Sequence, residues 1–373
     1  MNHFSLAFDV GTTNLDGRLY PAAGDSPAAV IRERNAQRRW GADIISRIQF
    51  ANTNDAQGAL LQRTLLTQIA QMTTSLLAQA GGGVVDRAVL VGNTAMLHFL
   101  CGLSVKGLGA APFAPSSFFG SHITWGELWG APDQTAAIPP EARVFIPPCT
   151  GAFTGADLTA ALTTLENRKG IDAPFFLADL GTNCEVAFHG AGQEGTILAA
   201  SAAAGPAFEG GAVSMDLPGS ALVTALAAAL DNGRIDRTGR LAPQAADGGS
   251  GFTQGDVRAL QLAKAAVCAA LAILAGEAGD PSLRDAPLYL CGAFGDAIVP
   301  AAAARIGLVP ARFMGRVIPT GNAALDGAAL MLGDGDAQQA AMCIAGRTRP
   351  VELAADPRFP KAFMDALDFS ENL

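Results

Sequence analysis

Two short stretches of this chain repeat one pattern, an apolar run that ends in Asp-x-Gly-Thr. The first is LAFDVGTTN at residues 6–14, and the second is FLADLGTNC at residues 176–184. An apolar strand, a glycine turn and a second apolar run predict a β-hairpin in each place. Asp9 and Asp179 are 170 residues apart, far beyond the period of solenoid repeats. The repeat therefore predicts two lobes of similar fold, each presenting one hairpin turn.

The residue types in these turns suit a phosphate group. Glycine lets the backbone approach an anion and turn its N–H groups toward it, and threonine hydroxyls add donors. An aspartate at the strand end can hold Mg²⁺ through water, because Mg²⁺ keeps most of its hydration shell. Two such turns facing each other would clamp a polyphosphate, and closure of the lobes would then depend on the nucleotide. The alternative is that each is only a glycine-containing hairpin turn.

Small residues also gather in other segments. Gly292-Ala293-Phe294-Gly295 follows an apolar strand and could let an adenosine lie against the backbone. Helices expected over 151–165 and 320–332 are rich in Gly and Ala and would allow close backbone crossing at a hinge, with ordinary helix packing as the alternative. A G-x-G-x-x-G match at 190–195 precedes a strand-like run rather than a helix, so we interpret it as another hairpin turn and not a dinucleotide site.

Composition excludes several classes of protein. With 25 basic and 34 acidic residues, the chain lacks the basic footprint of nonspecific nucleic-acid binding. The six cysteines form no CxxC pair for zinc or an iron–sulfur cluster. The longest apolar run, around 265–276, is too short to span a bilayer, and the N-terminus lacks a signal peptide. We expect a cytoplasmic protein with neither a membrane nor a nucleic-acid partner.

A chain of 373 residues corresponds to about two and a half domains. We expect an α/β fold with one lobe at 1–168, a second at 169–346 and a C-terminal tail at 347–373. Residues 104–140 are rich in proline, glycine and aromatic residues. They predict a long irregular excursion, and such loops are often functional or face a partner.

The segments run in an order that resembles the superfamily of acetate and sugar kinases, heat-shock chaperone ATPases and actin. Within it, the chain looks closer to one family, the ATP-dependent reductive activators of corrinoid proteins. The pieces are Asn35 and Gln37 with GADIISRI (41–48), VGNTAMLHFL (91–100), GADLTAA (155–161), DLGTNCEV (179–186), AAGPAFEGG (203–211), FTQGDVRALQLAKAA (252–266), CGAFG (291–295), GNAALDGAA (321–329) and VELAADPRF (351–359). They cover nearly the whole chain and are specific collectively rather than singly.

The resemblance implies two actin-like, ribonuclease H-like lobes with ATP and Mg²⁺ in the cleft between them. It also implies that ATP hydrolysis drives an electron onto an inactive Co(II) corrinoid, a cobalamin, and restores Co(I) in a corrinoid protein or corrinoid methyltransferase system. Full-length activators carry an N-terminal ferredoxin-like domain with a 2Fe–2S cluster. This chain starts almost at the first hairpin without a four-cysteine signature. We therefore expect no iron–sulfur cluster in it and an external ferredoxin-like electron donor.

The same resemblance assigns residues to the nucleotide. Asn14 stands where the family has a third threonine, and Cys184 stands where it has a glycine. Cys184 could crowd the phosphate or act as a redox-sensitive thiol, and we favour a tolerated small side chain. The assigned residues are Asp9, Gly11, Thr12 and Thr13 in the first phosphate loop, Asp179, Gly181, Thr182, Asn183 and Glu185 in the second, Gly292, Phe294 and Gly295 in the adenosine turn, and Gly321 and Asn322 before the last helix.

Hydrolysis of ATP needs a group that orients water and charge that stabilises the transferred phosphoryl group. We expect Asp9 and Asp179 to hold Mg²⁺ through water, and Glu185 or Asp157 to position the attacking water. Glu185 could instead be an exposed strand residue, and Asp157 a helix N-terminal carboxylate favoured by the helix dipole. Arg47 could bind phosphate or pair on the surface.

We therefore predict an ATPase that drives the reductive activation of a partner corrinoid protein. Two alternatives stay open. One is a small-molecule kinase of the same superfamily, which would turn over ATP only with its substrate. The other is a non-catalytic module that closes on ATP without hydrolysing it.

Overall fold

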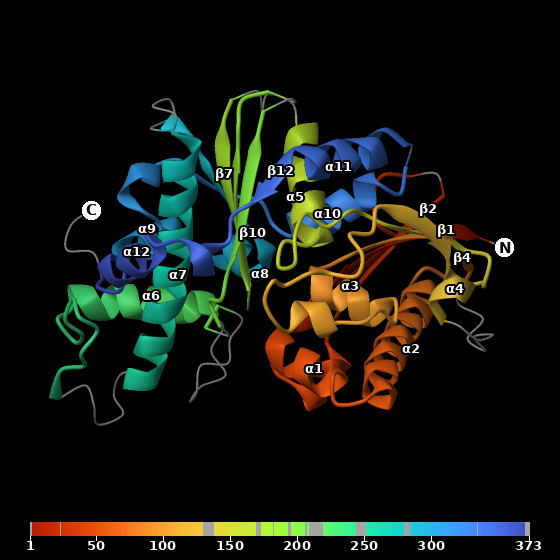
Figure 1. The fold of residues 1–373 in the computed structure, drawn as a ribbon, viewed down its shortest axis with the longest axis horizontal. Coiled ribbons are helices and arrows are strands. Elements are labelled where there is room, and N and C mark those ends of the chain that lie inside the picture. Colours follow the sequence, from red (N-terminus) through yellow and green to blue (C-terminus); the bar gives the residue numbers. More distant parts are fainter. Residues whose placement is uncertain are drawn as a thin grey trace. The chain divides into compact units, whose positions relative to one another are not determined.

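The structure is a computed structural model that describes residues 2–369 apart from 23, 130–137, 169–172, 182, 193–194, 206, 209–218, 244–250, 280–282, 284 and 334. The chain forms two compact units (Figure 1). One comprises Met1–Lys169 and Ala323–Gly346, and the other comprises Gly170–Asn322 and Arg347–Leu373. The chain thus enters the second unit, returns to the first at Ala323 and leaves it again at Arg347.

These units differ from the expected domains in two stretches. Residues 323–346 were expected to end the second lobe, but they pack in the first unit. Residues 347–373 were expected to be a separate tail, but they belong to the second unit. The reason is long-range packing, because Ala324 and Ala328 are buried against the sheet of the first unit. No local pattern in the sequence reveals which sheet a helix will cover.

In the first unit, the strands lie in the order β3-β2-β1-β4-β6-β5. β1, β4 and β6 are parallel, and β2, β3 and β5 are antiparallel to their neighbours. The central strand β1 is buried on both faces, with Leu6 and Phe8 on one side and Ala7 on the other. The strands are β1 (His3–Val10), β2 (Asn14–Pro21), β3 (Ala29–Arg34), β4 (Val84–Val91), β5 (Ser121–Thr124) and β6 (Arg143–Ile146).

Helices cover both faces of this sheet. The face that carries Leu6 and Phe8 packs against α1 (Ile44–Ala51), α2 (Asp55–Gln79), α3 (Thr94–Leu100) and α4 (Trp125–Trp129). The face that carries Ala7 packs against α5 (Ala156–Asn167), α10 (Ala323–Leu330) and α11 (Gly335–Arg347). Short 3₁₀ turns occupy Ala36–Trp40 and Lys106–Leu108.

The two small-residue helices of this unit cross closely, as their composition predicts. A Cβ added to Gly327 of α10 would lie 2.0 Å from the carbonyl oxygen of Ala160 in α5. Thr164 of α5 also donates its hydroxyl to the carbonyl of Ala323 at 2.7 Å. Because backbone meets backbone at Gly327, only a residue without a side chain fits there.

In the second unit, the strands lie in the order β11-β10-β7-β8-β9-β12. The strands are β7 (Phe175–Leu180), β8 (Cys184–His189), β9 (Ile197–Ala202), β10 (Leu288–Cys291), β11 (Val317–Pro319) and β12 (Thr348–Pro350). The helices are α6 (Gly219–Asp231), α7 (Gln254–Ala278), α8 (Gly292–Ala297), α9 (Pro300–Arg305) and α12 (Phe359–Asp365), with 3₁₀ turns at Ala311–Phe313 and Leu353–Ala355.

The predicted internal repeat is confirmed at the level of topology. β9-β8-β7-β10-β11 matches β3-β2-β1-β4-β6 in order, and each pair of neighbours has the same sense in both units. Residues 190–196 join the antiparallel strands β8 and β9, where the Gly190 amide donates to Thr196 O at 3.0 Å. Residues 193–194 of the G-x-G-x-x-G match lie outside the described part of the chain, but a strand and not a helix follows the match, as predicted.

The long helix α7 forms the centre of the second unit's core. Its length and composition would let it cross a membrane, but 67% of its most apolar window is buried within the fold. That burial is typical of the core helix of a globular domain. It begins in a capping box between Thr253 and Asp256 and ends at Gly279, whose φ of 61° terminates the helix.

The end of the chain is anchored to α7 rather than trailing from it. Lys264 is only 1% exposed, and its Nζ donates to the carbonyls of Ala366 and Asp368 at 2.5 and 2.7 Å. Burial lowers the pKa of Lys264. These contacts pin the residues that follow α12 to the core.

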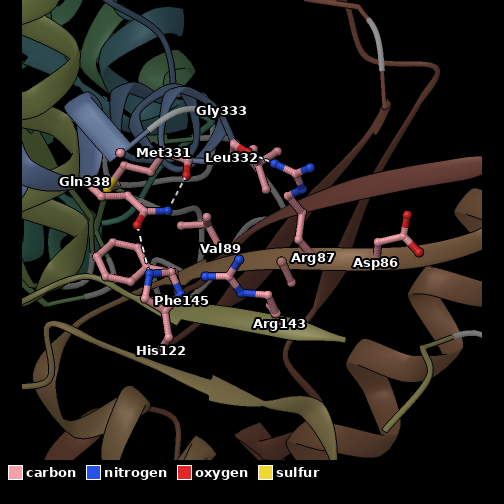
Figure 2. A pocket seen from close by; sticks show the side chains of 12 residues that line it. Asp86, Arg87, Val89, His122, Arg143, Phe145, Met331, Leu332, Gly333 and Gln338 are labelled. Atoms are coloured by element: carbon pink, nitrogen blue, oxygen red, sulfur yellow. Dashed lines mark hydrogen bonds between the residues drawn. The ribbon is translucent and has the colours of Figure 1, made fainter. Parts of the chain in front are cut away.

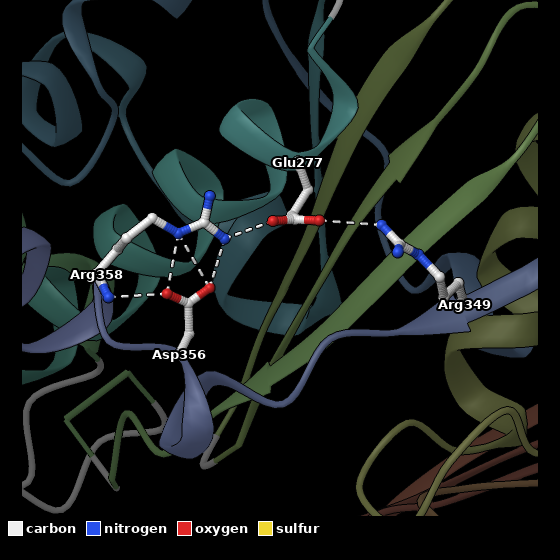
Figure 3. Close-up of polar contacts among 4 residues, drawn as sticks. All are labelled: Glu277, Arg349, Asp356 and Arg358. Carbon is white, nitrogen blue, oxygen red and sulfur yellow. Dashed lines mark hydrogen bonds and ion pairs between the residues drawn. The ribbon is translucent and has the colours of Figure 1, made fainter.

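A group of ion pairs adds to this anchoring (Figure 3). Glu277, near the end of α7, binds Arg358 at 2.6 Å and Arg349 at 3.1 Å. Arg358 also binds Asp356 at 2.5 Å. Hydrogen bonds from Arg358 and then Arg349 lower the pKa of Glu277. Exposed pairs of this kind contribute little one by one, so the buried Lys264 contacts dominate the anchoring.

The excursion at 104–140 is less irregular than expected, because it contains β5 and α4. Residues 130–137 lie outside the described part of the chain. His98 of α3 holds the excursion, since its Nε2 accepts the amides of Ser116 and Ser117 at 3.2 and 3.3 Å. Its Nδ1 contacts the carbonyl of Thr94 at 2.7 Å, which fixes the proton on Nδ1. Burial lowers the pKa of His98 and keeps the ring neutral.

Candidate functional site

The first Asp-x-Gly-Thr turn joins β1 to β2, with Val10 paired to Leu15. Three hydrogen-bond donors bind the backbone carbonyl oxygens of this turn. Asn35 Nδ2 donates to Gly11 O at 2.8 Å, Arg47 Nη2 donates to Thr12 O at 2.6 Å, and the Asn35 amide donates to Thr13 O at 2.8 Å. A Cβ on Gly11 would lie 2.6 Å from Asn14 O, so the turn requires glycine. The turn is therefore held in one conformation by its carbonyls, a prerequisite for presenting amides to an anion.

Arg47 holds this turn from inside the fold. It is 0% exposed and also donates to Gly41 O at 3.0 Å and to Gln37 Oε1 at 3.3 Å. Gln37 in turn donates to Leu61 O at 2.9 Å. Both alternatives for Arg47, a phosphate ligand and a surface ion pair, are therefore wrong. Its role is to position the turn, which the sequence alone does not reveal because the acceptors are backbone carbonyls.

We expect Arg47→Met to lower the free energy of unfolding by about 2 kcal/mol, since it leaves buried carbonyls without donors. Nucleotide affinity should fall with it, because the Gly11–Thr13 turn loses its support. Denaturant titration and ATP titration measure the two effects. Arg38→Met is the matched control, because Arg38 is exposed on the neighbouring 3₁₀ turn. Equal behaviour of the two variants would contradict this role.

Asn93 connects the turn to α3. Its side chain accepts the Met96 amide at 3.0 Å as the helix N-cap and donates to Thr12 Oγ1 at 3.0 Å. Since the Thr12 oxygen accepts this bond, its hydroxyl proton remains to be donated. This role of Asn93 was not predicted, although an asparagine between a strand and a helix is a typical N-cap signal.

Asp157 lies at the start of α5, beside the end of β4. The amides of Ala156 and Asp157 donate to Gly92 O at 3.0 and 3.3 Å. A Cβ on Gly155 would lie 2.4 Å from Asn93 Cα and 2.5 Å from Gly92 O, so this approach depends on glycine. Desolvation by burial raises the pKa of Asp157 to about 6. Its Oδ1 accepts the Leu158 amide at 2.8 Å, so Asp157 is a helix N-terminal carboxylate whose pKa is raised.

The carboxyl end of β1 gathers these groups. Asp9 is half-buried, pairs in register with Val91 of β4, and precedes the turn by two residues. It also lies opposite Asp16 of β2. Burial raises the pKa of Asp16, although Arg32 and Arg18 counteract it. Asp16 was not predicted as a site residue. Its counterpart in the second hairpin, Glu185, lies one residue closer to the aspartate of the turn, so the two acids do not align in the sequence.

The second turn, in the other unit, joins β7 to β8 and is one residue shorter, with Leu180 paired to Cys184. Gly181 and Asn183 lie in it, and Thr182 lies outside the described residues. Cys184 aligns with Leu15 of the first hairpin, and its side chain is 0% exposed in the core. Its Sγ contacts Gly181 O of the turn at 3.5 Å, so Cys184 is a small core side chain that also contacts the backbone of the turn.

Asp179 and Glu185 lie opposite each other on β7 and β8. Glu185 is only 7% exposed and accepts a hydrogen bond from Ser201 Oγ at 3.4 Å. The alternative that Glu185 is an exposed strand residue is therefore wrong. Residues paired across antiparallel strands share one face of the sheet, so the second unit brings two carboxylates together beside its turn.

Gly292 and Gly321 meet Asp179 at the carboxyl ends of β7 and β10. Gly292 has a φ of 82°, and a Cβ there would lie 2.5 Å from Asp179 Oδ1. Its amide donates to Gly321 O at 3.0 Å, and Asn322 follows directly. The backbone therefore approaches the Asp179 carboxylate so closely that only glycine fits at this position.

Two residues expected to contact adenosine are buried elsewhere. Phe294 is 5% exposed and packs on the ring of Phe208 with centroids 4.7 Å apart. A Cβ on Gly295 would lie 3.0 Å from the carbonyl carbon of Leu290. The GAFG stretch begins α8 instead of forming an open turn. Within this stretch, the first glycine, Gly292, lies beside Asp179.

The carboxylates of these strand ends suit Mg²⁺ better than a metal ion whose ligands all come from the protein. Among the described residues, no three His, Cys, Asp or Glu side chains form a group that could hold a metal ion. Mg²⁺ needs only one or two carboxylates when water and phosphate oxygens complete its shell. Each unit has one such carboxylate at the end of its central strand, Asp9 in the first and Asp179 in the second.

Two family descriptions match this chain in tandem. "RACo middle region" matches residues 4–169, and "C-terminal domain of RACo the ASKHA domain" matches residues 173–218 and 245–372. A curated relative, the "Corrinoid activation enzyme RamQ" of Eubacterium limosum, is 28% identical over 99% of this chain and 71% of its own length.

A solved structure agrees with the family descriptions. The "Reductive activator for corrinoid, iron-sulfur protein" aligns with a TM-score of 0.87 and 23% identity over 98% of this chain. This chain covers 66% of that protein, just under two thirds of its length. The comparison confirms the predicted fold, an α/β chain of the actin-like ASKHA class.

Proposed function

This chain belongs to the family of RACo-type reductive activators of corrinoid proteins, and on that premise we propose that it couples ATP hydrolysis to corrinoid reduction. The partner is a corrinoid protein or corrinoid methyltransferase whose cobalt is in the inactive Co(II) state. One electron from an external ferredoxin-like protein converts Co(II) into Co(I), and hydrolysis of ATP to ADP and phosphate supplies the free energy.

The chain's own residues divide the work on the nucleotide. The turns at Gly11–Thr13 and Gly181–Asn183 donate hydrogen bonds to phosphate oxygens. Asp9 and Asp179 would hold Mg²⁺ through its water ligands, and the ion would supply positive charge against the phosphates. Gly292 and Gly321 leave space for the nucleoside, and Asn322 supplies a polar contact. Asp157 takes the proton of the attacking water, and Glu185 helps to orient it.

One observation supports this proposal most directly. Each unit ends its central strand in the same Asp-x-Gly turn, and in each unit a glycine from another element approaches that turn's strand end. In the first unit, a Cβ on Gly92 would lie 2.7 Å from Val10 O; in the second, a Cβ on Gly292 would lie 2.5 Å from Asp179 Oδ1. An ordinary hairpin needs neither approach.

The test is an optical assay of a Co(II) corrinoid protein with an external reductant, with and without ATP. Formation of Co(I) that requires ATP and this chain supports the proposal. Phosphate release that appears only with a sugar or carboxylate would select the kinase alternative. Tight ATP binding with no phosphate release would select the non-catalytic module.

We expect Asp9→Asn and Asp179→Asn each to weaken Mg²⁺-dependent ATP binding about tenfold to a hundredfold. The reason is the loss of a charge-assisted hydrogen bond to the ion's water. Calorimetric titration with ATP in Mg²⁺ and in EDTA measures the change. Asp25→Asn, on the exposed β2–β3 connection, is the control and should bind as the wild type does. A loss of affinity equal in Mg²⁺ and in EDTA would contradict a role in holding the ion.

A further inference from the structure

A polar pocket lies in the first unit, and none of the residues assigned to the nucleotide lines it. It has a volume of about 430 Å³ and opens on the sheet face covered by α10 and α11 (Figure 2). Its floor comes from β4, β5 and β6, and its rim comes from the residues that follow α10 and from the start of α11. Arg87 and Arg143 point into it in Figure 2.

The two arginines lie side by side. Arg87 of β4 and Arg143 of β6 are paired in register on parallel strands. Arg87 Nη1 donates to Leu332 O at 3.1 Å. Among the described residues, nothing hydrogen bonds the Arg143 guanidinium, and no carboxylate pairs with either arginine. Like charges on neighbouring strands repel each other, and an anion bound between them would relieve that repulsion.

The neighbouring acids do not supply that anion. Asp86 lies at the edge of the pocket (Figure 2). It binds His3 Nδ1 at 2.7 Å. Asp336, in the first turn of α11, is exposed and does not pair with either guanidinium. The chain as a whole carries a net charge of −9, and Arg87 and Arg143 give this pocket a local positive charge.

A third polar group is oriented toward the same space. His122 Nε2 contacts Gln338 Oε1 at 3.0 Å, and Gln338 Nε2 donates to Met331 O at 2.9 Å. This chain of bonds fixes the proton of His122 on Nε2. The His122 ring also packs on Phe145 with centroids 4.8 Å apart. Phe145 and Val89 add apolar wall to the pocket.

We propose that this pocket binds a small organic anion, with a phosphate or carboxylate group between Arg87 and Arg143 and an apolar body on Phe145 and Val89. A guanidinium pair matches the planar, bidentate demand of such groups. The volume suits a small ligand, because pockets of this class start near 300 Å³. The site stands apart from the nucleotide residues and does not depend on the proposed function.

An occupant would also tie the inserted segment to the sheet. Leu332 and Gln338 belong to residues 323–346, the stretch that returns from the second unit. α10 of this segment crosses α5, and α5 carries Asp157 at its start. Binding should therefore protect α10 and α11 from amide hydrogen exchange.

The test uses phenyl phosphate as the probe, with benzoate as the carboxylate arm and inorganic phosphate as the arm without an apolar body. Arg143→Gln should bind phenyl phosphate about tenfold to a hundredfold more weakly than the wild type. Arg63→Gln is the control with the same change of charge, because Arg63 is exposed on α2. Arg143→Lys keeps the positive charge but loses the forked guanidinium. Its affinity for phenyl phosphate should therefore lie between those of Arg143→Gln and Arg63→Gln.

Several results would overturn the proposal. One is the absence of saturable binding of phenyl phosphate and benzoate to the wild type at 0.15 M salt. Another is equal affinity in Arg143→Gln and Arg63→Gln, which would place the anion elsewhere, for example on the nucleotide turns. Because Arg143 makes no hydrogen bond within the described fold, a matching melting temperature of the variants separates lost binding from lost folding.

Discussion

Replacing Asp157 by asparagine is expected to lower ATP turnover about 10²- to 10⁴-fold, the usual contribution of a general base. ATP affinity should change little, because Asp157 acts on the water and not on the phosphates. The same change should raise the melting temperature. Desolvation raises the pKa of Asp157 to about 6, so the ionised carboxylate is unfavourable in the folded protein at neutral pH.

The direction of the pH dependence follows from that value. The folded pKa is about 6, against an ordinary value of 3.8 for an aspartate side chain. This carboxyl therefore favours the fold fully below its unfolded pKa, and that contribution is lost as the pH rises through about 6. The stability advantage of Asp157→Asn should thus be largest above pH 6 and shrink below it. Wild-type turnover should fall about tenfold per unit below the same pH, because the base becomes protonated.

Asp55→Asn is the matched control for Asp157→Asn. Asp55 occupies the first turn of α2 and is exposed, so its main contribution is to the helix dipole. Its replacement should leave turnover unchanged and lower the melting temperature slightly. If Asp157→Asn also kept full turnover, or lost stability as Asp55→Asn does, Asp157 would be only a helix-terminal carboxylate.

Gly327→Ala is expected to cause the largest loss of stability, about 3 kcal/mol, at the upper end of overpacking effects. The added Cβ would lie 2.0 Å from Ala160 O and 2.6 Å from Ala160 C, so the two helices must separate. The higher helix propensity of alanine, up to about 1 kcal/mol, offsets only part of this cost. Thermal melting measures the loss, and amide exchange of α5 and α10 should locate it.

Gly58→Ala provides the comparison for Gly327→Ala. Gly58 lies within α2, and the nearest atom to an added Cβ is Ala51 O at 3.9 Å. This substitution should stabilise the protein by about 0.5–1 kcal/mol, since alanine loses less entropy on folding. Opposite signs for the two substitutions would confirm that contact geometry decides at Gly327. Stabilisation by both would show that α10 can move away from α5 at little cost.

The hairpins and the duplicated fold could be predicted because their signals are local. Alternating apolar residues around Asp9-Val10-Gly11 predict a strand and a turn without knowledge of any distant residue. The small residues around Gly327 likewise predict a close helix crossing. Even so, the sequence did not reveal that the second turn is one residue shorter than the first. That difference concealed Asp16 as the counterpart of Glu185, since it appears only in the strand register.

What depends on distant partners required the tertiary structure. Arg47 supports the first turn because the fold brings its guanidinium against Thr12 O, 35 residues away. Phe294 is buried in the core because the ring of Phe208 packs on it. Residues 323–346 join the first unit because their small side chains cover its sheet. Arg87 and Arg143 form a pocket because β4 and β6 become neighbours. In each case a local pattern specifies the residue's own conformation, and only packing selects its partner, because burial and hydrogen bonding depend on which surfaces meet.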